Sequence, residues 1–284
     1  MASDQSFVIR PMTRSELKTV RGWAEEEGWN PGLHDCDTYY GTDPGGYLSG
    51  HVDGEMVAAI SAVRYGEGFG FVGLYIVRPS FRGQGYGMRM WNAGLANLGT
   101  RVAGLDGVVQ RQGDYRRSGF ALAFRNMRYC GVTAPATARP DELVPLQSIS
   151  FDALLRYDAR MFPAERRTFL QGWINQAGSQ GFVSRRDGGI SGYGVIRPAA
   201  SGYRIGPLFA DDPETAEALF AALAGSVPTG QPLYLDLPEP NGQALQLAER
   251  HGMSLVFETA RMYKGPAPEL PLDRIYGITT FELG

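Results

Sequence analysis

The sequence predicts an α+β fold built from two similar units. The chain has 284 residues, which corresponds to about two domains of ordinary size. Strand-like and helix-like apolar patterns alternate through both halves. Similar segments also recur about 133 residues apart, on either side of a break rich in Ala, Pro and Thr. We therefore expect units at residues 1–132 and 142–284, joined by a linker at 133–141. Each unit should be a mixed, twisted sheet flanked by helices.

The elements of the first half follow from local signals. Thr13 and Glu16 form a capping box before a helical pattern, and Gly28 can end that helix. Asp53 and Gly54 separate two strand-like runs and predict a hairpin. The expected strands are 7–10, 46–52, 56–65, 69–77, 105–110 and 122–129, with further helices at 84–98 and 115–118.

The second half repeats this order more loosely. Asp187-Gly188-Gly189 predicts a turn between two strands, and the apolar run 275–283 is expected to pack back as a strand. The expected helices are 151–156, 164–176, 213–224 and 242–251, and the expected strands are 181–185, 191–197, 203–209, 233–237 and 255–263.

Composition excludes several classes of function. The formal net charge is −3, so no broad basic field is available for binding nucleic acid. Two cysteines and three histidines provide neither a disulfide framework nor the spacing of a metal site. No run of 18 apolar residues and no apolar leader occurs, so we expect a cytoplasmic protein without a membrane partner. The oligomeric state is left open.

The segment with the clearest chemistry is a Gly-rich turn between a strand and an amphipathic helix. Arg82, Gly83, Gly85 and Gly87 stand in this turn. Glycines let the backbone approach a pyrophosphate, and the N-terminus of the helix adds partial positive charge. The spacing differs from the G-x-G-x-x-G dinucleotide fingerprint, and no Gly-Lys-Ser/Thr of a P-loop follows. A turn without any ligand is the alternative.

This segment resembles the acetyl-CoA-binding motif of the GNAT superfamily of N-acetyltransferases. Arg82, Gly85 and Gly87 fit its Arg/Gln-x-x-Gly-x-Gly/Ala spacing. The segment from Tyr115 to Phe120 is similar to the Tyr-x-x-x-Gly-Phe segment that follows the fifth strand of that family. The resemblance covers about residues 7–131. The stretch between Gln110 and Tyr115 departs from it, because it is shorter than usual and lacks the common Asn.

The resemblance implies acetyl-CoA as acyl donor and assigns roles to the matching positions. The backbone of Ile76 and Val77 should face the pantetheine arm. Tyr115 matches the tyrosine that protonates the departing thiolate, and a phenol with a pKa of about 10 keeps its proton at neutral pH. The reaction needs no metal and no covalent intermediate. The pyrophosphate should lie on Arg82, Gly83, Gln84, Gly85, Tyr86 and Gly87.

The acceptor amine is expected near residues 25–35, where the acceptor loop of the family lies. Trp29, Asn30, His34 and Asp35 fall in an irregular loop with Gly and Pro and are the expected substrate-binding residues. The three glutamates before them are expected to form a solvated helix end. The acceptor is left open among amino acids, polyamines, aminoglycosides, peptide N-termini and lysine side chains.

The second half lacks every functional position of the first. The counterparts of Arg82, Gly85, Gly87 and Tyr115 are Thr215, Ala218, Phe220 and Ala248. Asp212 and Pro213 form a good helix start, but their segment places carboxylates where a pyrophosphate would lie. The chain is thus similar to bacterial tandem GNAT proteins with a degenerate second half.

Two functions remain from the sequence. The first is an acetyl-CoA-dependent N-acetyltransferase, in which a small-molecule or peptide amine attacks the thioester directly in the N-terminal half. The alternative is a protein that binds acyl-CoA as a sensor or scaffold without turnover. A pure interaction module is disfavoured because the motif around Arg82 is complete.

Overall fold

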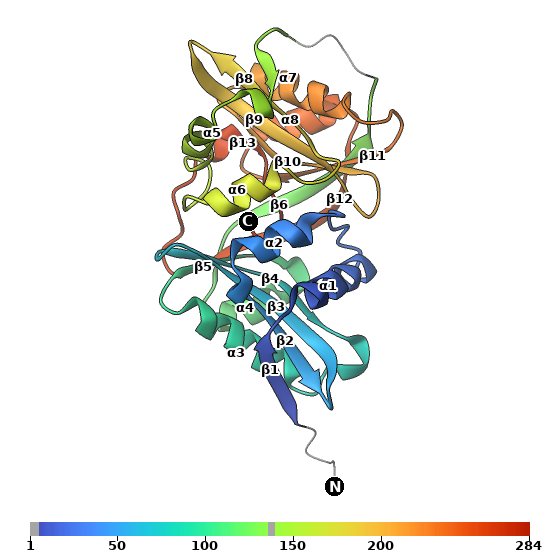
Figure 1. The fold of residues 1–284 in the computed structure, drawn as a ribbon, viewed down its shortest axis with the longest axis vertical. Helices are drawn as coiled ribbons and strands as arrows, with labels where there is room; N and C mark the ends of the chain where they lie inside the picture. Colours follow the sequence, from blue (N-terminus) through green and yellow to red (C-terminus); the bar gives the residue numbers. More distant parts are fainter. Residues whose placement is uncertain (1–5, 136–139) are drawn as a thin grey trace.

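The computed structural model describes residues 6–135 and 140–284, and these residues form eight α-helices and thirteen strands. All thirteen strands belong to one sheet that runs through the whole molecule (Figure 1). Residues 136–139 of the expected linker lie outside the described residues.

The first half contains the elements that the sequence predicts and one that it did not. The capping box of Thr13 and Glu16 is present, and Gly28 follows the helix with a φ of +78°. The unpredicted element is helix α2, which begins at the last residue of the expected loop. The bounds are β1 Phe7–Pro11, α1 Arg14–Glu26, α2 Asp35–Thr42, β2 Tyr47–Val52, β3 Glu55–Tyr65, β4 Phe69–Val77, α3 Tyr86–Leu98, β5 Val102–Val108, α4 Gln112–Arg117 and β6 Ala121–Val132.

The second half repeats this order. Strand β7 was not predicted, and only the start of the expected tail strand is a strand. The bounds are β7 Leu143–Pro145, α5 Phe151–Asp158, α6 Arg167–Trp173, β8 Gln180–Arg186, β9 Gly189–Pro198, β10 Tyr203–Ala210, α7 Pro213–Ala224, β11 Pro232–Pro238, α8 Gly242–Arg250, β12 Ser254–Lys264 and β13 Ile275–Gly277.

The two halves exchange their last long strands. The strand order is β1-β2-β3-β4-β5-β12-β6-β11-β10-β9-β8-β7, with β13 paired to β10. Strand β12 of the second half pairs antiparallel with β5 of the first, and β6 of the first half pairs antiparallel with β11 of the second. Strands β6 and β12 also pair with each other, so the sheet is continuous across the expected boundary.

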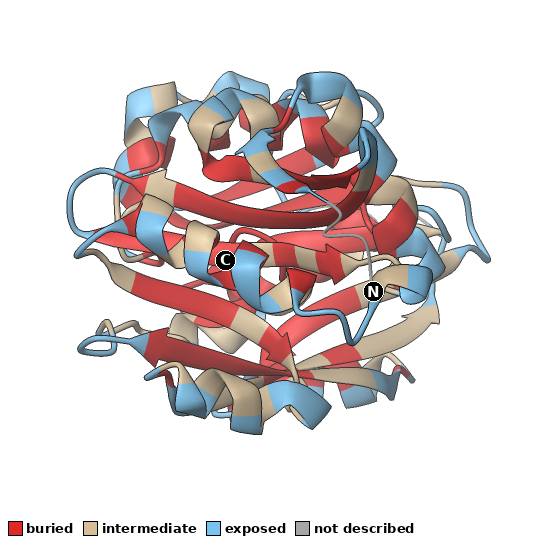
Figure 2. Ribbon diagram, turned by 90° about the horizontal axis from the view of Figure 1, so that it is seen from below, coloured by how far each residue is buried: buried red, intermediate tan, exposed pale blue. Residues whose placement is uncertain are grey.

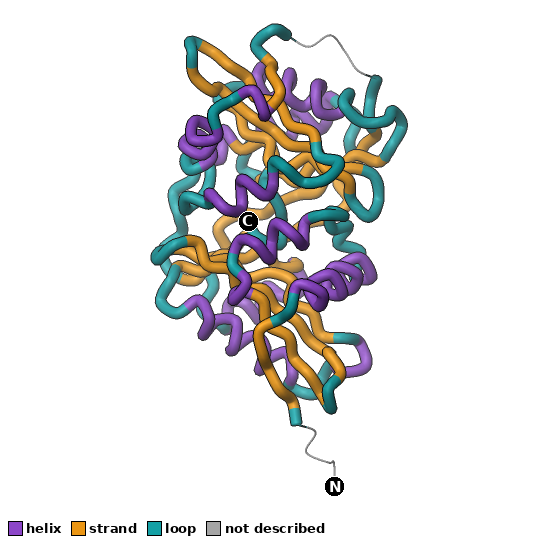
Figure 3. The backbone as a smooth tube through the Cα atoms, viewed as in Figure 1, coloured by secondary structure: helices purple, strands orange, loops and turns teal. Residues whose placement is uncertain are grey.

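Helices cover the sheet on both faces and form three cores. Alternate residues of β3 enter different cores, as the two-residue repeat of a strand requires: Ala59 and Val63 face α1 and α2, and Ile60 faces α3. The core under α1 and α2 continues into α5 and α6 of the second half. Helices α2 and α6 lie side by side between the halves (Figure 3), and the strands of the sheet are largely buried (Figure 2).

Parallel strands separate at one point in each half. Strands β4 and β5 pair only along Phe69–Val72 and Val102–Leu105. Strands β10 and β11 pair only along Tyr203–Ile205 and Leu233–Leu235. We call these points the first and the second opening. Strand β13 contacts both β10 and β11 and so fills the second opening.

Candidate active site

A cavity of about 500 Å³ lies at the first opening. Its wall comes from six places: the residues just after α1, β4, the Gly-rich turn with the start of α3, β5, the segment around α4, and residues of the second half. The last group consists of Phe257, Thr259, Phe281 and Glu282. The exchange of β12 and the return of the tail therefore bring the second half into this cavity.

The Gly-rich turn offers a row of free backbone donors. Gly83 and Gly85 have φ values of +78° and +83°, which L side chains rarely adopt, and Gly85 caps α3. Among the described residues, no hydrogen-bond acceptor is found for the N–H groups from Gly83 to Met88. A Cβ at Gly87 would lie 2.6 Å from the hydroxyl of Tyr75. The turn thus has the shape and the dipole of an anion site.

The side chains of this turn make contacts within the protein. Tyr86 is buried and stacks on Phe7 at 4.6 Å between ring centroids, so only its backbone N–H is available to a ligand. Gln84 donates its side-chain amide to the carbonyl of Ser80. The guanidinium of Arg82 donates to the carbonyl of Val77 at 2.8 Å and forms an ion pair with Glu27. The end of α1 is therefore tied to the predicted pyrophosphate loop.

Tyr115 lines the same cavity from α4. Its ring lies against Gly107 of β5, where a Cβ would collide with it, and 5.5 Å from the ring of Trp91. Burial raises the pKa of Tyr115 to about 12, and the nearby Tyr75 acts in the same direction. The phenol therefore keeps its proton at neutral pH and can donate it.

Strand β4 presents its backbone to the cavity. Ile76 and Val77 pair with Ala59 and Ala58 of β3 on one side and have passed the end of the β5 pairing on the other. A bulge precedes them, with Leu74 at a φ of +44°. Both residues line the cavity, and their contact with a pantetheine arm stays a prediction.

Of the four residues predicted to bind substrate, only Trp29 lines the cavity. Asn30 forms two hydrogen bonds with the backbone of Ser201, and its side chain thus joins the two halves. Asp35 is buried and pairs with Arg197 at 2.9 Å. His34 is exposed at the start of α2. The loop is thus mainly an interface between halves.

Sequence reasoning missed much of the cavity wall, including five residues that lie far from the Gly-rich turn in the sequence. They are Asp106, Phe257, Thr259, Phe281 and Glu282. The tail stood out as an apolar run, but no local signal indicated that it contacts residues about 200 positions earlier in the sequence. The backbone of Glu282 lies against Gly73 of β4, and any side chain at Gly73 would collide with its carbonyl. Only glycine fits this contact.

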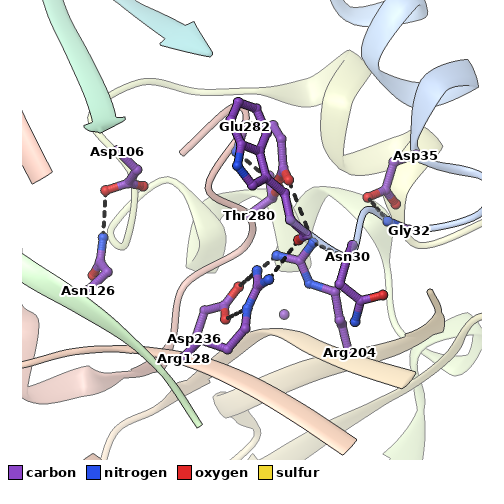
Figure 4. A network of polar contacts seen from close by, with 12 residues as sticks. Asn30, Gly32, Asp35, Asp106, Asn126, Arg128, Arg204, Asp236, Thr280 and Glu282 are labelled. Atoms are coloured by element: carbon purple, nitrogen blue, oxygen red, sulfur yellow. Dashed lines mark hydrogen bonds and ion pairs between the residues drawn. The ribbon is translucent and has the colours of Figure 1, made fainter. Parts of the chain in front are cut away.

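A buried network of ion pairs contacts the loop before α2 and fixes its position (Figure 4). Asp236 of β11 accepts from Arg128 at 2.6 and 2.8 Å and from Arg204 at 2.6 Å. Burial opposes the charge of Asp236, but the two guanidiniums outweigh it and lower its pKa to about 2. The same arginines donate to the carbonyls of Trp29 and Asn30, and thereby fix this loop at the cavity.

Comparison with known proteins identifies the family. Residues 13–120 match the Acetyltransferase (GNAT) family, and residues 154–277 match an Acetyltransferase (GNAT) domain. The chain is 30% identical to the holothin acyltransferase of Pseudoalteromonas sp. (strain SANK 73390), over all of this chain and 97% of the relative. This chain belongs to the GNAT acetyltransferase family. It is an acyltransferase with two GNAT domains in tandem.

Solved structures of the family share the fold. A putative acetyltransferase from Pyrococcus horikoshii superposes with a TM-score of 0.83 at 22% identity, covering all of this chain and 98% of that one. A tandem GNAT protein from the clavulanic acid biosynthesis pathway superposes with a TM-score of 0.63 at 13% identity, covering 93% of this chain and all of that one.

The second GNAT domain has a different helix start at its opening. Asp212 caps α7 by accepting from the N–H of Thr215 at 2.8 Å, and it pairs with Arg186 at 2.5 Å. Pro213 occupies the first turn, as predicted. The counterpart of Tyr115, Ala248, is buried in α8. The start of α3 in the first domain therefore has free backbone amides, whereas the start of α7 in the second domain is capped by an aspartate of the protein itself.

In the part of the chain that the structure describes, no three His, Cys, Asp or Glu side chains are grouped so that they could hold a metal ion. Among the helices within 6–135 and 140–284, none combines the length and apolar character needed to cross a membrane.

Proposed function

We propose that this acyltransferase moves the acetyl group of acetyl-CoA to the amine of a small molecule, in the cavity of the N-terminal domain. One observation carries the proposal: Gly83, Gly87 and Met88, whose backbone amides are free, and the protonated phenol of Tyr115 line one cavity. An anion site and a proton donor are what a CoA thioester requires at its two ends. The named relative, a holothin acyltransferase, also supports a small-molecule acceptor.

The residues of the turn fit the donor substrate. Six consecutive N–H groups, the N-terminus of α3 and Arg82 supply positive potential for a pyrophosphate. The unpaired edge of β4 at Ile76 and Val77 suits the amide groups of a pantetheine arm. The N–H of Val77 is one of the donors expected to polarise the thioester carbonyl.

The chemical step is a direct transfer. The amine nitrogen attacks the thioester carbon, the C–S bond breaks, and Tyr115 gives its proton to the departing sulfur. Among the cavity carboxylates, Glu282 is the one we assign to accept the proton from nitrogen. Asp106 and Glu27 have close arginine partners, whereas the contact of Glu282 with Arg204 is 3.7 Å. The backbone of Glu282 also lies at Gly73, beside the bulge of β4.

The proposal uses only part of the residues expected from sequence. Trp29 is retained as a wall of the acceptor site. Asn30 and Asp35 act in the interface between the domains, and His34 is outside the cavity. The second opening is not proposed as a second active site, because β13 fills it.

Calorimetric titration with acetyl-CoA tests the proposal. We expect one site per chain in the wild type and no binding by Gly85→Glu, because the new carboxylate lies in the anion site. Ala218→Glu is the matched control, since Ala218 is the counterpart on α7. It should bind acetyl-CoA normally. Two sites per chain, or loss of binding in the control alone, would contradict the assignment to the N-terminal domain.

Turnover separates the enzyme from a sensor. An acyl-CoA sensor would bind the ligand and form no acetylated product with any amine in a screen. An acetyltransferase releases free CoA thiol in an amine-dependent reaction. Absence of acetyl-CoA binding in the wild type would remove both functions.

A further inference from the structure

Two hydroxyl groups hold one carboxylate oxygen of Glu282. Thr280, in the same tail, donates its hydroxyl to Oε2 (Figure 4). The hydroxyl of Tyr39 lies 3.3 Å from that oxygen and 2.9 Å from the hydroxyl of Thr280. The other oxygen, Oε1, has Arg204 at 3.7 Å, and within residues 6–135 and 140–284 no hydrogen bond to it is found. One oxygen of this carboxylate is thus fixed, and the other is available to accept a proton.

Tyr39 reaches the carboxylate from the first domain. It stands on α2, is buried, and lies parallel to the ring of Trp173 on α6 at 6.2 Å between ring centroids. Burial and the charges of Asp35 and Glu282 raise the pKa of Tyr39 well above its ordinary value. The phenol therefore keeps its proton and acts as a hydrogen-bond donor between the domains.

This phenol has one proton and lies beside two carboxylates. Asp35 is 3.3 Å from the hydroxyl, as far away as Glu282. However, Asp35 also accepts from the guanidinium of Arg197 at 2.9 Å and from the N–H of Gly32 at 3.1 Å. Glu282 has no arginine within hydrogen-bond distance among the described residues. Because a buried charge with few donors is costly, the phenol proton stabilises Glu282 more than Asp35, directly or through Thr280.

We infer that Tyr39 and Thr280 are positioning residues of the acetyl transfer. Their hydroxyl groups hold Oε2 of Glu282 and leave Oε1 to take the proton of the amine. This inference rests on the proposed function, in which Glu282 is the proton acceptor. In that step an N–H bond breaks, its electron pair stays on nitrogen, and Glu282 becomes a neutral carboxylic acid. Tyr39 keeps its own proton, and the sulfur takes its proton from Tyr115.

Two buried tyrosines that both donate to the tail provide the first test, in the full-length protein. Tyr39→Phe removes the hydroxyl and keeps the ring. Tyr65→Phe is the matched control, because Tyr65 donates to the carbonyl of Leu283 at 3.1 Å rather than to the side chain of Glu282. We expect Tyr39→Phe to lower kcat about tenfold, as for a lost hydrogen bond to a charged group, and to leave the Kd for acetyl-CoA unchanged. Unchanged kcat in Tyr39→Phe, or an equal loss in Tyr65→Phe, would overturn the inference.

Turnover is followed by the release of CoA thiol at saturating acetyl-CoA. The acceptors are alanine, spermidine, kanamycin, trialanine, Nα-acetyl-lysine and aniline, and the amine with the highest wild-type kcat/KM is used for all variants. If the wild type binds acetyl-CoA and releases no CoA thiol with any of them, the proposed function is refuted, and the inference falls with it.

The pH dependence separates positioning from a loss of stability. A hydrogen bond donated to a carboxylate favours its charged form, so Glu282 should take up a proton at higher pH once the donor is lost. The acidic limb of kcat/KM should therefore move to higher pH by about one unit in Tyr39→Phe and keep its position in Tyr65→Phe. A limb that keeps its position in Tyr39→Phe would overturn the inference. The ionisation of the amine is the same for all variants, as are the charged groups in and beside this network: Asp35 on α2, Arg128 on β6, Arg197 on β9, Arg204 on β10 and Asp236 on β11.

Thr280 provides the same test from the second domain. Thr280→Val replaces the hydroxyl by a methyl group of similar size and should behave like Tyr39→Phe. Thr280→Ser keeps the hydroxyl and should restore most of the kcat that Thr280→Val loses. If Tyr39→Phe does not fold, this pair decides the question. A loss in Thr280→Ser as large as that in Thr280→Val would overturn the inference.

Glu282→Gln distinguishes failure of the inference from failure of the proposed function. We expect kcat to fall about 100-fold in Glu282→Gln, because general base catalysis contributes on that order. In this background Tyr39→Phe should cause no further loss, since the hydroxyl acts through the carboxylate. A further tenfold loss in the double variant would overturn the inference. Full activity of Glu282→Gln would instead refute the proton acceptor assigned in the proposed function.

Discussion

Strands β4 and β5 separate around a cavity, whereas β10 and β11 separate around a third strand, β13. Each opening has a glycine at an equivalent position of the sequence. These glycines, Gly73 and Gly206, lie 133 residues apart, and both contact the tail. Gly73 meets the carbonyl of Glu282, and Gly206 meets that of Thr279. One tail thus closes the second opening and borders the first.

The comparison shows how one fold holds a cavity at one opening and a packed strand at the equivalent one. The first opening ends in a helix start with free amides, and the second in a helix start capped by Asp212. The sheet and its separation point are the same in both. The difference lies in a few residues at the helix start and in the path of the tail, so the site depends on its loops more than on the fold.

An equivalent ion pair also differs between the openings. In each, an aspartate of the parallel strand pairs with an arginine of the exchanged strand: Asp106 with Arg261, and Asp236 with Arg128. Burial raises the pKa of Asp106 despite its arginine. Asp236 has Arg204 as a second partner, and its pKa falls to about 2. Asp236, at the filled second opening, therefore stays ionised to lower pH than Asp106, at the cavity.

Removing the proton donor tests the chemistry of the first opening and has the largest expected effect. Tyr115→Phe should lower kcat by about 100-fold or more, because general acid catalysis contributes on that order. The Kd for acetyl-CoA should stay unchanged. The kcat is measured by the release of CoA thiol, and the Kd is measured by calorimetry. Tyr75→Phe is the control, since Tyr75 also lines the cavity. Full activity in Tyr115→Phe, or an equal loss in Tyr75→Phe, would contradict the assignment.

Acid unfolding tests the difference between the two aspartates. The folded-state pKa of Asp236, about 2, lies below its ordinary value of 3.8. Its charge therefore stabilises the fold above about pH 4 and loses this effect as the pH falls toward 2. The difference between the two values corresponds to about 2 kcal/mol. The stability advantage of the wild type over Asp236→Asn, measured by urea unfolding, should shrink by that amount between pH 7 and pH 2.

Asp106→Asn is the matched variant for this measurement. Since its pKa is raised on folding, the charge of Asp106 opposes folding above that pKa. The advantage of the wild type over Asp106→Asn should therefore grow, not shrink, as the pH falls through the titration of Asp106. Parallel behaviour of the two variants would refute the asymmetry between the openings.

Freeing Arg82 should have the smallest effect. Glu27→Gln removes the carboxylate that pairs with Arg82 and leaves the guanidinium available to a pyrophosphate. The pair is partly exposed, so the change in free energy should be below about 1 kcal/mol, or a few-fold tighter binding of acetyl-CoA. Glu26→Gln is the control, because Glu26 pairs with Arg78 and lies outside the cavity wall. Weaker binding by Glu27→Gln would show that the ion pair positions the loop.

Local sequence patterns predicted most elements, including the Gly-rich turn and the short helix that border the cavity. The turn from Arg82 to Gly87 and the short helix of Tyr115 depend on neighbouring residues, and both were found near their expected positions. Helix α2 was missed because its eight residues include two aspartates, a glycine and two threonines, and its apolar pattern is weak. Helix α3 begins two residues later than expected, since Gly85 adopts a left-handed conformation.

The cavity wall that the second half contributes depends on contacts between distant residues and was not predictable in this way. The exchange of β6 and β12 has no local signal, because either strand suits either half. Asn30 and Asp35 are polar loop residues, and the same composition suits substrate binding and an interface. Their partners, Ser201 and Arg197, lie more than 160 residues away. Glu282 stands in an apolar tail, which suggested only packing.

The strand exchange has a consequence for how the protein is made. Asp106 on β5 is synthesised before its ion-pair partner Arg261 on β12, which follows 155 residues later. At about 5–20 residues per second, a ribosome needs roughly 8 to 30 s to synthesise that stretch. During this time the first domain has an open sheet edge, to which another nascent chain can add a strand. We expect the yield of folded protein to depend on the speed of translation through the second domain, although the proposed chemistry takes place in the first.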